Sequence, residues 1–280
     1  MKKLLAMLLL LVSAASHAEE VVKIMWGFGP MPAYTSAIRM VEILNKTQTD
    51  YKFVLDIKSG VGGSLAASQA LQSNSLLLTS NSFIIKGVTA TEAWDKPENF
   101  SMLYIQSLHN PLFLISKNYR SMDELMKTGT PNVAVSALGG ITDLAAKELT
   151  KHKANVVSYK TMQAGLIDAY GGHIDAGIGT WQHVSQFVEN KKIFLIDSTA
   201  KHNNMKELQL EFYVLAPKTY DKRKLKEFNE LFNRVGNSDY VRAPFAEDNA
   251  EFVEYDLDKT EKWYKKRQDF WRKYLAHVAK

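Results

Sequence analysis

Residues 132–145 read Asn132-Val133-Ala134-Val135-Ser136-Ala137-Leu138-Gly139-Gly140-Ile141-Thr142-Asp143-Leu144-Ala145. The alternating valines predict a short buried strand, and the glycine pair predicts a tight turn that leads into a helix. A helix that begins after such a turn offers free backbone N–H groups and partial positive charge. The hydroxyl of Ser136 or Thr142 could cap or line the turn. The stretch therefore predicts a place for a small anion, with an ordinary strand–helix connection as the alternative.

A second turn of the same kind lies near residues 27–36. Gly27-Phe28-Gly29-Pro30-Met31-Pro32 follows a candidate strand at 21–26 and precedes a candidate helix at 33–44. Two prolines before a helix fit a rigid entry loop. Because both turns leave helix N-termini open, we hypothesise that they face each other across a cleft and hold a small carboxylate.

The first eighteen residues have the features of a secretory signal peptide. A basic start at Lys2-Lys3 precedes an apolar run at 4–12, and Ser16-His17-Ala18 places small residues at −3 and −1 of a cut before Glu19. The run is too short to span a bilayer. The remaining chain has no comparably apolar stretch of 18 residues and no cysteine to carry a lipid anchor. We therefore expect a soluble, exported, periplasmic protein.

The composition excludes several classes of function. The 280 residues are 46% hydrophobic, which supports one large or two ordinary domains. No cysteine is present, which excludes disulfides, thiol catalysis and thiolate metal sites. The net charge of +5 falls to +3 once Lys2 and Lys3 leave with the signal peptide. No dense basic stripe with interleaved aromatics is present, so we expect no nucleic-acid partner.

The order of predicted elements repeats a strand–helix pattern. Strands are expected at 21–26, 51–58 and 76–79, with helices at 33–44 and 64–71 between them, and an irregular stretch at 83–99. Two more strands at 101–107 and 112–116 precede a second series, with strands at 133–135, 156–159, 174–178 and 193–196 and helices at 141–152, 162–170 and 181–188. A strand at 212–216 and helices at 223–235 and 259–278 complete the chain. The pattern predicts two successive α/β units whose ligands bind at the carboxyl ends of the strands.

The last predicted helix carries an aromatic stripe. Trp263, Phe270, Trp271 and Tyr274 recur at helical spacing, which is typical of a packing face. We expect this stripe to pack against the core.

Several short stretches follow the order and spacing of one known family. The most specific is Tyr159-Lys160 followed by Ala164, Asp168, Gly171-Gly172 and Asp175. The others are residues 24–39 with Phe28, Pro30 and Arg39 in register, 58–63, 76–78, 136–149 and 215–217. Together, over roughly residues 21–236, they resemble the periplasmic solute-binding proteins of tripartite tricarboxylate transporters, the Bug family.

The resemblance implies an α/β, two-domain periplasmic-binding-protein fold of the Venus-flytrap type II class, with two crossing strands near 112–116 and 212–216. After a signal peptide at 1–18, the first domain would comprise 19–110 and 218–280, and the second 111–217. In this family two loops act as pincers on a ligand carboxylate, through backbone N–H groups and ordered water. The implied ligand-binding residues are Phe28, Gly29, Ala33, Tyr34 and Thr35 on one loop, and Ser136, Gly139, Gly140, Ile141 and Thr142 on the other.

Five further residues could contact the rest of the ligand: Thr79, Ser80, Asn81, Tyr159 and Thr180. Surface or capping roles are the alternative for each. We expect no catalytic residue, no metal site and no cofactor.

Three departures from the family pattern affect the ligand. The first loop reads Met31-Pro32-Ala33-Tyr34-Thr35 where the family has Gly-Gly-Ser-Thr-Asp. Gly179-Thr180 replaces the family's Asp-Asn, and Glu211 replaces a tryptophan. The resemblance therefore does not identify the ligand, although a ligand amine is less expected where an acidic residue is lost.

The leading prediction is a monomeric periplasmic receptor that delivers a small organic carboxylate to membrane permease subunits. A receptor that loads a membrane sensor kinase has the same binding chemistry and is the alternative. An exported hydrolase is disfavoured, because His109, His152, His173 and His183 lack metal-ligand spacing and no G-x-S-x-G elbow is present. Dicarboxylates, tricarboxylates, aromatic acids and amino acids all fit a backbone clamp, so the ligand identity stays open.

Overall fold

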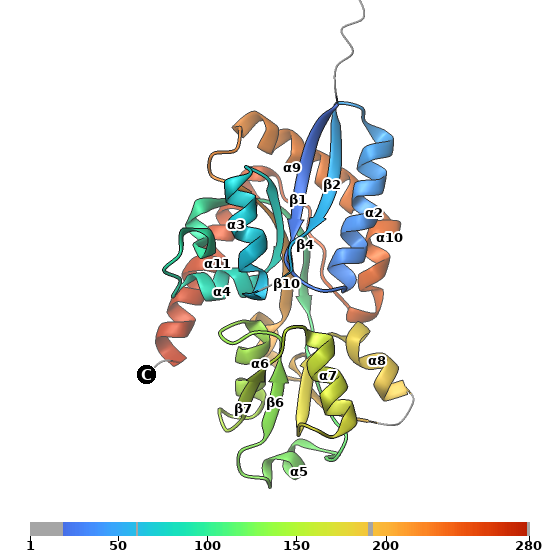
Figure 1. The fold of residues 1–280 in the computed structure, drawn as a ribbon, viewed down its shortest axis with the longest axis vertical. Helices are drawn as coiled ribbons and strands as arrows, with labels where there is room; N and C mark the ends of the chain where they lie inside the picture. Colours follow the sequence, from blue (N-terminus) through green and yellow to red (C-terminus); the bar gives the residue numbers. More distant parts are fainter. Residues whose placement is uncertain (1–18, 60, 190–192, 279–280) are drawn as a thin grey trace, which may run out of the picture.

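A computed structural model describes residues 19–59, 61–189 and 193–278. The chain forms two lobes, each built on one five-stranded sheet (Figure 1). The predicted signal peptide lies outside the described residues. Within those residues, no helix is both long and apolar enough to cross a membrane.

The first lobe is a mixed sheet with strand order β2-β1-β3-β10-β4. Strand β1 runs parallel to β2 and β3, whereas β10 pairs antiparallel with both β3 and β4. The strands are β1 (Glu20–Trp26), β2 (Tyr51–Ile57), β3 (Leu76–Ser80), β4 (Phe100–Asn110) and β10 (Leu210–Pro217). All residues of β3 and β10 are buried, as expected for central strands covered on both faces.

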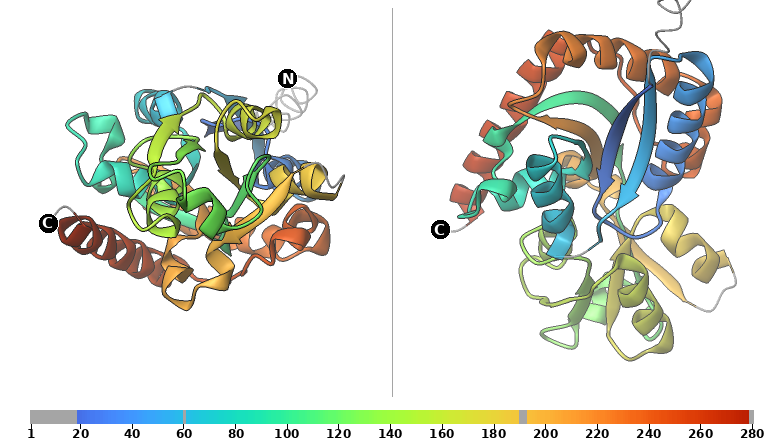
Figure 2. Two further views of the ribbon diagram at one scale, coloured as in Figure 1. Left: turned by 90° about the horizontal axis from the view of Figure 1, so that it is seen from below. Right: turned by 45° about the horizontal axis from the view of Figure 1, so that its top comes forward.

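Helices from both ends of the chain cover this sheet, as the two views of Figure 2 show. They are α2 (Pro32–Thr47), α3 (Ser64–Gln72), α4 (Asn81–Gly87), α9 (Lys222–Gly236), α10 (Asp239–Arg242) and α11 (Leu257–Val278). The N-terminal and C-terminal parts of the chain therefore share one core.

The second lobe has strand order β7-β6-β8-β5-β9, with β6 parallel to β7 and β8, and β5 antiparallel to β8 and β9. Its strands are β5 (Phe113–Ser116), β6 (Asn132–Val135), β7 (Asn155–Ser158), β8 (Ala176–Gly179) and β9 (Phe194–Ser198). Its helices are α5 (Met122–Met126), α6 (Ile141–Leu149), α7 (Met162–Gly171) and α8 (Trp181–Glu189). The side chain of Thr161 caps α7 by accepting from the Ala164 N–H at 3.2 Å, and Gly172, at φ 77°, ends that helix.

The predicted α/β fold and the repeated strand–helix order are confirmed, with two differences. Residues 83–99 were expected to be irregular, but 81–87 form α4 and two short 3-10 helices follow at 93–95 and 97–99. The sequence assigned 212–216 to the second domain, whereas Leu210–Pro217 pairs with strands of the first sheet. The sequence of an apolar strand does not indicate the sheet to which the strand belongs, because sheet membership depends on pairing partners that are distant in sequence.

The aromatic stripe of α11 packs as expected. Trp271 is fully buried, Tyr264 is nearly so, and the Tyr264 hydroxyl donates to the Pro97 carbonyl at 3.0 Å. Between these rings the guanidinium of Arg267 lies 5.1–5.6 Å from the ring centroids of Trp263, Phe270 and Trp271.

The buried partner of Arg267 is Glu211, the residue that replaces the family's tryptophan on β10. Arg267 donates to both Glu211 carboxylate oxygens at 3.0 Å, and the Tyr213 hydroxyl donates to the same carboxylate. Burial raises the pKa of the Glu211 carboxyl to about 7, against the opposing effect of Arg267. This pair ties α11 to the strand that leads back from the second lobe.

We predict that Arg267→Met lowers the free energy of unfolding by about 3–5 kcal/mol, because Glu211 is left buried without its partner. Chemical denaturation at pH 8 measures the loss. Lys266→Met is the matched control, since Lys266 is exposed on the same helix and should change stability little. Equal stability of the two variants would show that the pair does not hold α11 in place.

Candidate functional site

A cavity of about 120 Å³ lies where the two lobes meet. One wall comes from the first lobe, through the loop after β1 and the turn after β2. The other comes from the second lobe, through the loop after β6 and the start of α7. The lining residues are Gly27, Phe28, Gly29, Pro30, Met31, Ser59, Gly62, Ser82, Ser136, Ala137, Lys160, Thr161, Met162, Gln163 and His183. Pockets between domains are common ligand sites.

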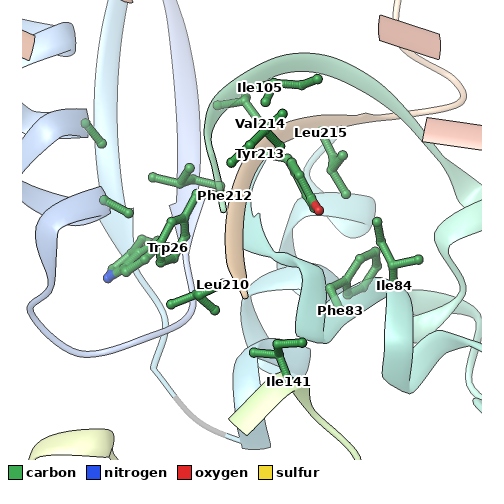
Figure 3. Packing of buried hydrophobic residues seen from close by; sticks show 14 of the residues in the cluster. Trp26, Phe83, Ile84, Ile105, Ile141, Leu210, Phe212, Tyr213, Val214 and Leu215 are labelled. Carbon is green, nitrogen blue, oxygen red and sulfur yellow. The ribbon is translucent and has the colours of Figure 1, made fainter. Parts of the chain in front are cut away.

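The first-lobe loop is held by Trp26 at the end of β1. Its indole stacks on Tyr34 at 6.0 Å and meets Phe28 edge-on at 5.2 Å, and its Nε1–H donates to the Gly29 carbonyl at 3.3 Å. Figure 3 shows Trp26 beside Phe212 of β10 in the core. The loop is therefore anchored to the centre of the first sheet.

Gly27 permits a close approach of two loops. A Cβ at this position would lie 2.7 Å from the Cα of Gly63, so only glycine fits without displacing the backbone. The two glycine turns of the first lobe thus pack directly against each other.

The second-lobe loop is held by the first turn of α6. The Ser136 N–H donates to the Thr142 hydroxyl oxygen at 3.2 Å, and the two hydroxyls lie 3.0 Å apart. The Gly139 N–H donates to the Asp143 carboxylate at 2.7 Å, and Asp143 also pairs with Lys147 at 2.9 Å. These bonds fix the loop shape independently of a ligand.

Four backbone N–H groups at the site have no acceptor within the described part of the chain. They belong to Phe28 and Gly29 on the first loop and to Ala137 and Leu138 on the second. Three of these residues line the cavity itself, and both lobes contribute to the set. Unpaired backbone N–H groups from both lobes can donate to one bound molecule, so this arrangement suits a ligand with several acceptor atoms, such as a carboxylate.

Contacts between the lobes already exist beside the cavity. The Ile141 N–H, at the start of α6, donates to the Ser82 hydroxyl oxygen on α4 at 3.1 Å. A Cβ on Gly140 would lie 3.1 Å from the same oxygen, so glycine lets the two helices approach. The N-terminus of α6 thus faces the first lobe, and one of its backbone N–H groups, that of Ile141, is already bonded to the Ser82 hydroxyl.

His183 of α8 makes a second contact between the lobes. Its Nε2 donates to the Pro30 carbonyl at 3.3 Å, so Nδ1 of the neutral ring accepts from the Thr180 hydroxyl at 2.9 Å. Burial lowers the pKa of His183, against the opposing effect of the Pro30 carbonyl, which favours the neutral ring at pH 7.

A buried carboxylate of the first lobe also faces α8. Asp248 is 2% exposed, and burial raises the pKa of its carboxyl to about 6, against the lowering effect of the Gln182 and Trp181 N–H groups. The start of α8 therefore contacts the first lobe through two residues, His183 against Pro30 and Asp248 against the N–H groups of Trp181 and Gln182.

The predicted ligand residues divide into two groups in the structure. Phe28, Gly29 and Ser136 line the cavity together. The other twelve do not line it, although Ile141, Gly140 and Thr142 hold the loop beside it. These twelve are Ala33, Tyr34, Thr35, Thr79, Ser80, Asn81, Gly139, Gly140, Ile141, Thr142, Tyr159 and Thr180.

Several of these twelve residues bond within the protein. Asn81 donates to the Gln209 carbonyl at 2.8 Å, the Tyr159 hydroxyl donates to Asp168 at 2.7 Å, and Thr180 bonds His183. Gly139 lines a neighbouring groove between α4, α6 and α11 rather than the cavity.

Sequence reasoning left out several lining side chains, chiefly Ser82, Lys160, Thr161, Met162, Gln163 and His183. Lys160 and Thr161 come two and three residues after the end of β7, so the rule that ligands bind at the carboxyl ends of strands would have pointed to them. His183 gave no such signal, because its contact with Pro30 joins residues 153 positions apart. No group of three His, Asp or Glu residues within the described residues could hold a metal ion.

No protein-family model matches this sequence, and no curated protein sequence matches it significantly. Solved structures do match. The periplasmic binding protein BugD superposes with a TM-score of 0.78 at 15% identity, covering 94% of this chain and 98% of its own. MatC from Rhodopseudomonas palustris with bound malate gives 0.73 at 15%, covering 91% and 98% of the two chains. The R. palustris protein Rpa4515 with adipate gives 0.73 at 18%, covering 91% and 95%.

These similarities establish the fold. The resemblance to the Bug proteins, drawn from short motifs, is confirmed at the level of architecture, and the predicted two-domain periplasmic-binding-protein fold is confirmed with it.

We predict that acidification destabilises the protein partly through His183. The folded-state pKa lies below the unfolded value of 6.5, so the unfolded chain binds the proton more readily and stability falls as pH drops below 6.5. Melting temperatures of wild type and His183→Gln from pH 7.5 to 5 measure this, because glutamine keeps a donor for Pro30 without titrating. The wild type should lose more stability over this interval, and identical pH slopes would contradict the assignment.

Proposed function

We propose that this chain, which has the fold of the periplasmic binding protein BugD, is a periplasmic receptor that captures a small organic carboxylate between its two lobes. The observation that carries the proposal is the cavity at the lobe junction, with unpartnered backbone N–H groups on the loops of both lobes. Both loops lead into helix N-termini, which favour an anion.

Two structural neighbours support the ligand class. MatC is described with malate and Rpa4515 with adipate, and both are small carboxylates held in the same fold. Phe28, Gly29 and Ser136 are the proposed contacts on the cavity wall, and Gly140, Ile141 and Thr142 position the second loop. Ordered water molecules can bridge the ligand to predicted residues that do not line the cavity.

Capture would proceed by closure of the lobes. The chain passes between the sheets at the connections from β4 to β5 and from β9 to β10, so a rotation there opens and closes the cavity. The bonds from Ile141 to Ser82 and from His183 to Pro30 form only when the lobes are together. Such contacts stabilise the closed state on which tight binding depends.

Delivery to permease subunits of a tripartite transporter follows from the family resemblance. Export to the periplasm follows from the signal-peptide pattern of residues 1–18. A receptor that loads a sensor kinase would use the same closed state. Genes for a large and a small membrane subunit beside this gene, whose deletion abolishes uptake of the bound carboxylate, would assign the protein to transport.

We predict that small carboxylates stabilise the purified protein against heat and that their amides do not. Ligand at a hundred times its dissociation constant adds about 2.7 kcal/mol, or roughly 5–10 °C in melting temperature for a chain of this size. A thermal-shift screen of about a hundred carboxylates with matched amides tests this. No stabilisation by any carboxylate would overturn the proposed function.

We further predict that Ser82→Ala weakens binding of whichever carboxylate the screen identifies. The Ile141 N–H then closes against the first lobe without its acceptor, at a cost of about 1–3 kcal/mol, or a 5- to 150-fold higher dissociation constant. Ser73→Ala is the matched control, because Ser73 is exposed and bonds only within the first lobe. Isothermal titration measures both, and equal affinities would show that this contact does not stabilise the closed state.

A further inference from the structure

The last helix of the chain reaches beyond the first lobe. α11 packs on the first lobe through Tyr264 and Trp271, both of which are buried. Its last turns run past α4 to the level of α6 in the second lobe (Figure 1). There the Tyr274 hydroxyl donates a hydrogen bond to the Glu148 carboxylate of α6 at 3.0 Å. Neither residue lines the cavity, so this bond joins the two lobes at a place away from the candidate site.

Neighbouring rings fix the direction of the Tyr274 hydroxyl. The Tyr274 ring stacks on Phe270 with centroids 5.9 Å apart and meets Trp271 edge-on at 5.6 Å. Burial, together with the bond to Glu148, raises the pKa of the Tyr274 hydroxyl, so the group is a hydrogen-bond donor at neutral pH. Because these contacts already order the side chain, little conformational entropy is lost when the bond to Glu148 forms.

The same face of α11 is bound to the connection between the lobes. Tyr274 follows Arg267 by close to two helical turns, so both side chains lie on one face. Arg267 donates to the Glu207 carboxylate in the 3-10 helix Asn203–Leu208, which lies on the connection from β9 to β10. Tyr274 lies about 10 Å farther along the helix. A rotation of the second lobe about this connection therefore separates Tyr274 from Glu148 more than it separates Arg267 from Glu207.

α6 is the helix that carries the second loop of the candidate site. Its first residue, Ile141, donates to Ser82 of the first lobe, and Glu148, two turns later, accepts from Tyr274. The first lobe thus holds α6 near both of its ends. A helix held at two points cannot tilt about either one, so the loop at residues 136–140 keeps its position relative to the first lobe.

We propose that Tyr274 is a positioning residue of the binding site, and that its bond to Glu148 makes α11 a strap that holds α6 and the second loop against the first lobe. This inference rests on the proposed function, because it gives the strap a part in the closure that captures the carboxylate. The strap does not touch the cavity. It therefore stabilises the closed state itself, and its loss favours the open state whichever carboxylate is bound.

The distance between the lobes tests the strap. The chain has no cysteine, so Ile38→Cys on α2 and Ile167→Cys on α7 provide defined sites for two spin labels. Both positions are exposed, and each lobe carries one of them. Pulsed electron spin resonance then measures the populations of the open and closed distances, without added carboxylate and with malate or adipate.

In the labelled protein, Tyr274→Phe should raise the ratio of open to closed molecules about threefold to tenfold, the loss expected for one hydrogen bond to a partly buried carboxylate. The substitution keeps the ring and removes only the hydroxyl. Tyr240→Phe is the matched control, because the Tyr240 hydroxyl donates to the Glu42 carboxylate at 3.1 Å within the first lobe. This control should leave the ratio unchanged.

A double substitution identifies the partner of the Tyr274 hydroxyl. Glu148→Ala should open the lobes about as much as Tyr274→Phe does. The two substitutions together should open them no further, because both remove the same bond. Effects that add would show that Tyr274 acts through another contact and would overturn the strap.

The outcomes separate the strap from the function on which it rests. The same distances and populations in wild type and Tyr274→Phe overturn the strap and leave the carboxylate receptor standing. An equal shift in Tyr240→Phe also overturns it, because the effect would then not depend on a contact between the lobes. A shift confined to Tyr274→Phe, with no stabilisation by any carboxylate in the thermal-shift screen, supports the strap as a contact between the lobes and overturns the proposed function.

Discussion

The antiparallel pairing of β10 with β3 and β4 is the constraint on which the rest of the molecule depends. The chain enters the first sheet again at β10, after it has formed all strands of the second lobe. In this pairing Phe212 lies opposite Ser80 of β3 and Ser107 of β4. Because β10 is buried along its full length, this return is held by the centre of the core. The second lobe is therefore joined to the first by two chain connections, from β4 to β5 and from β9 to β10. This topology leaves a cleft between the lobes.

The same pairing explains the buried ion pair at the start of β10. Glu211 would be costly in a buried strand, but Arg267 on α11 meets it with two hydrogen bonds and itself lies among three aromatic rings. The last helix of the chain is thus locked onto the strand that closes the first lobe.

The candidate site combines rigid loops with a small number of contacts between the lobes. Trp26 and Asp143 fix the two loops from within their own lobes, through stacking and a bond to the Gly139 N–H. Ser82 and His183 then join the lobes by single hydrogen bonds, and the Tyr274 hydroxyl on α11 donates to the Glu148 carboxylate on α6 at 3.0 Å. Individual hydrogen bonds contribute about 1 kcal/mol, so the lobes can separate while each loop keeps its shape. Such a balance suits the proposed receptor, which would have to open to release its ligand.

The sequence by itself determined the local structure. Hydrophobic periodicity and glycine turns placed nearly all strands and helices, the packing face of α11 and the two loops that meet at the cavity, because these features depend on residues close together in the chain. The helix at 81–87 escaped prediction because six of its seven residues are buried, which leaves no amphipathic pattern to detect.

Only the tertiary structure decided which strand enters which sheet and which side chains line the cavity. The pairing of β10, the contact of His183 with Pro30, and the presence of Phe28 and Met162 on the wall of one cavity all join segments far apart in sequence. Twelve of the predicted ligand residues stand back from the cavity wall because the loops turn several of these side chains toward bonds within the protein. Those bonds depend on how the lobes fold and meet, which no local pattern encodes.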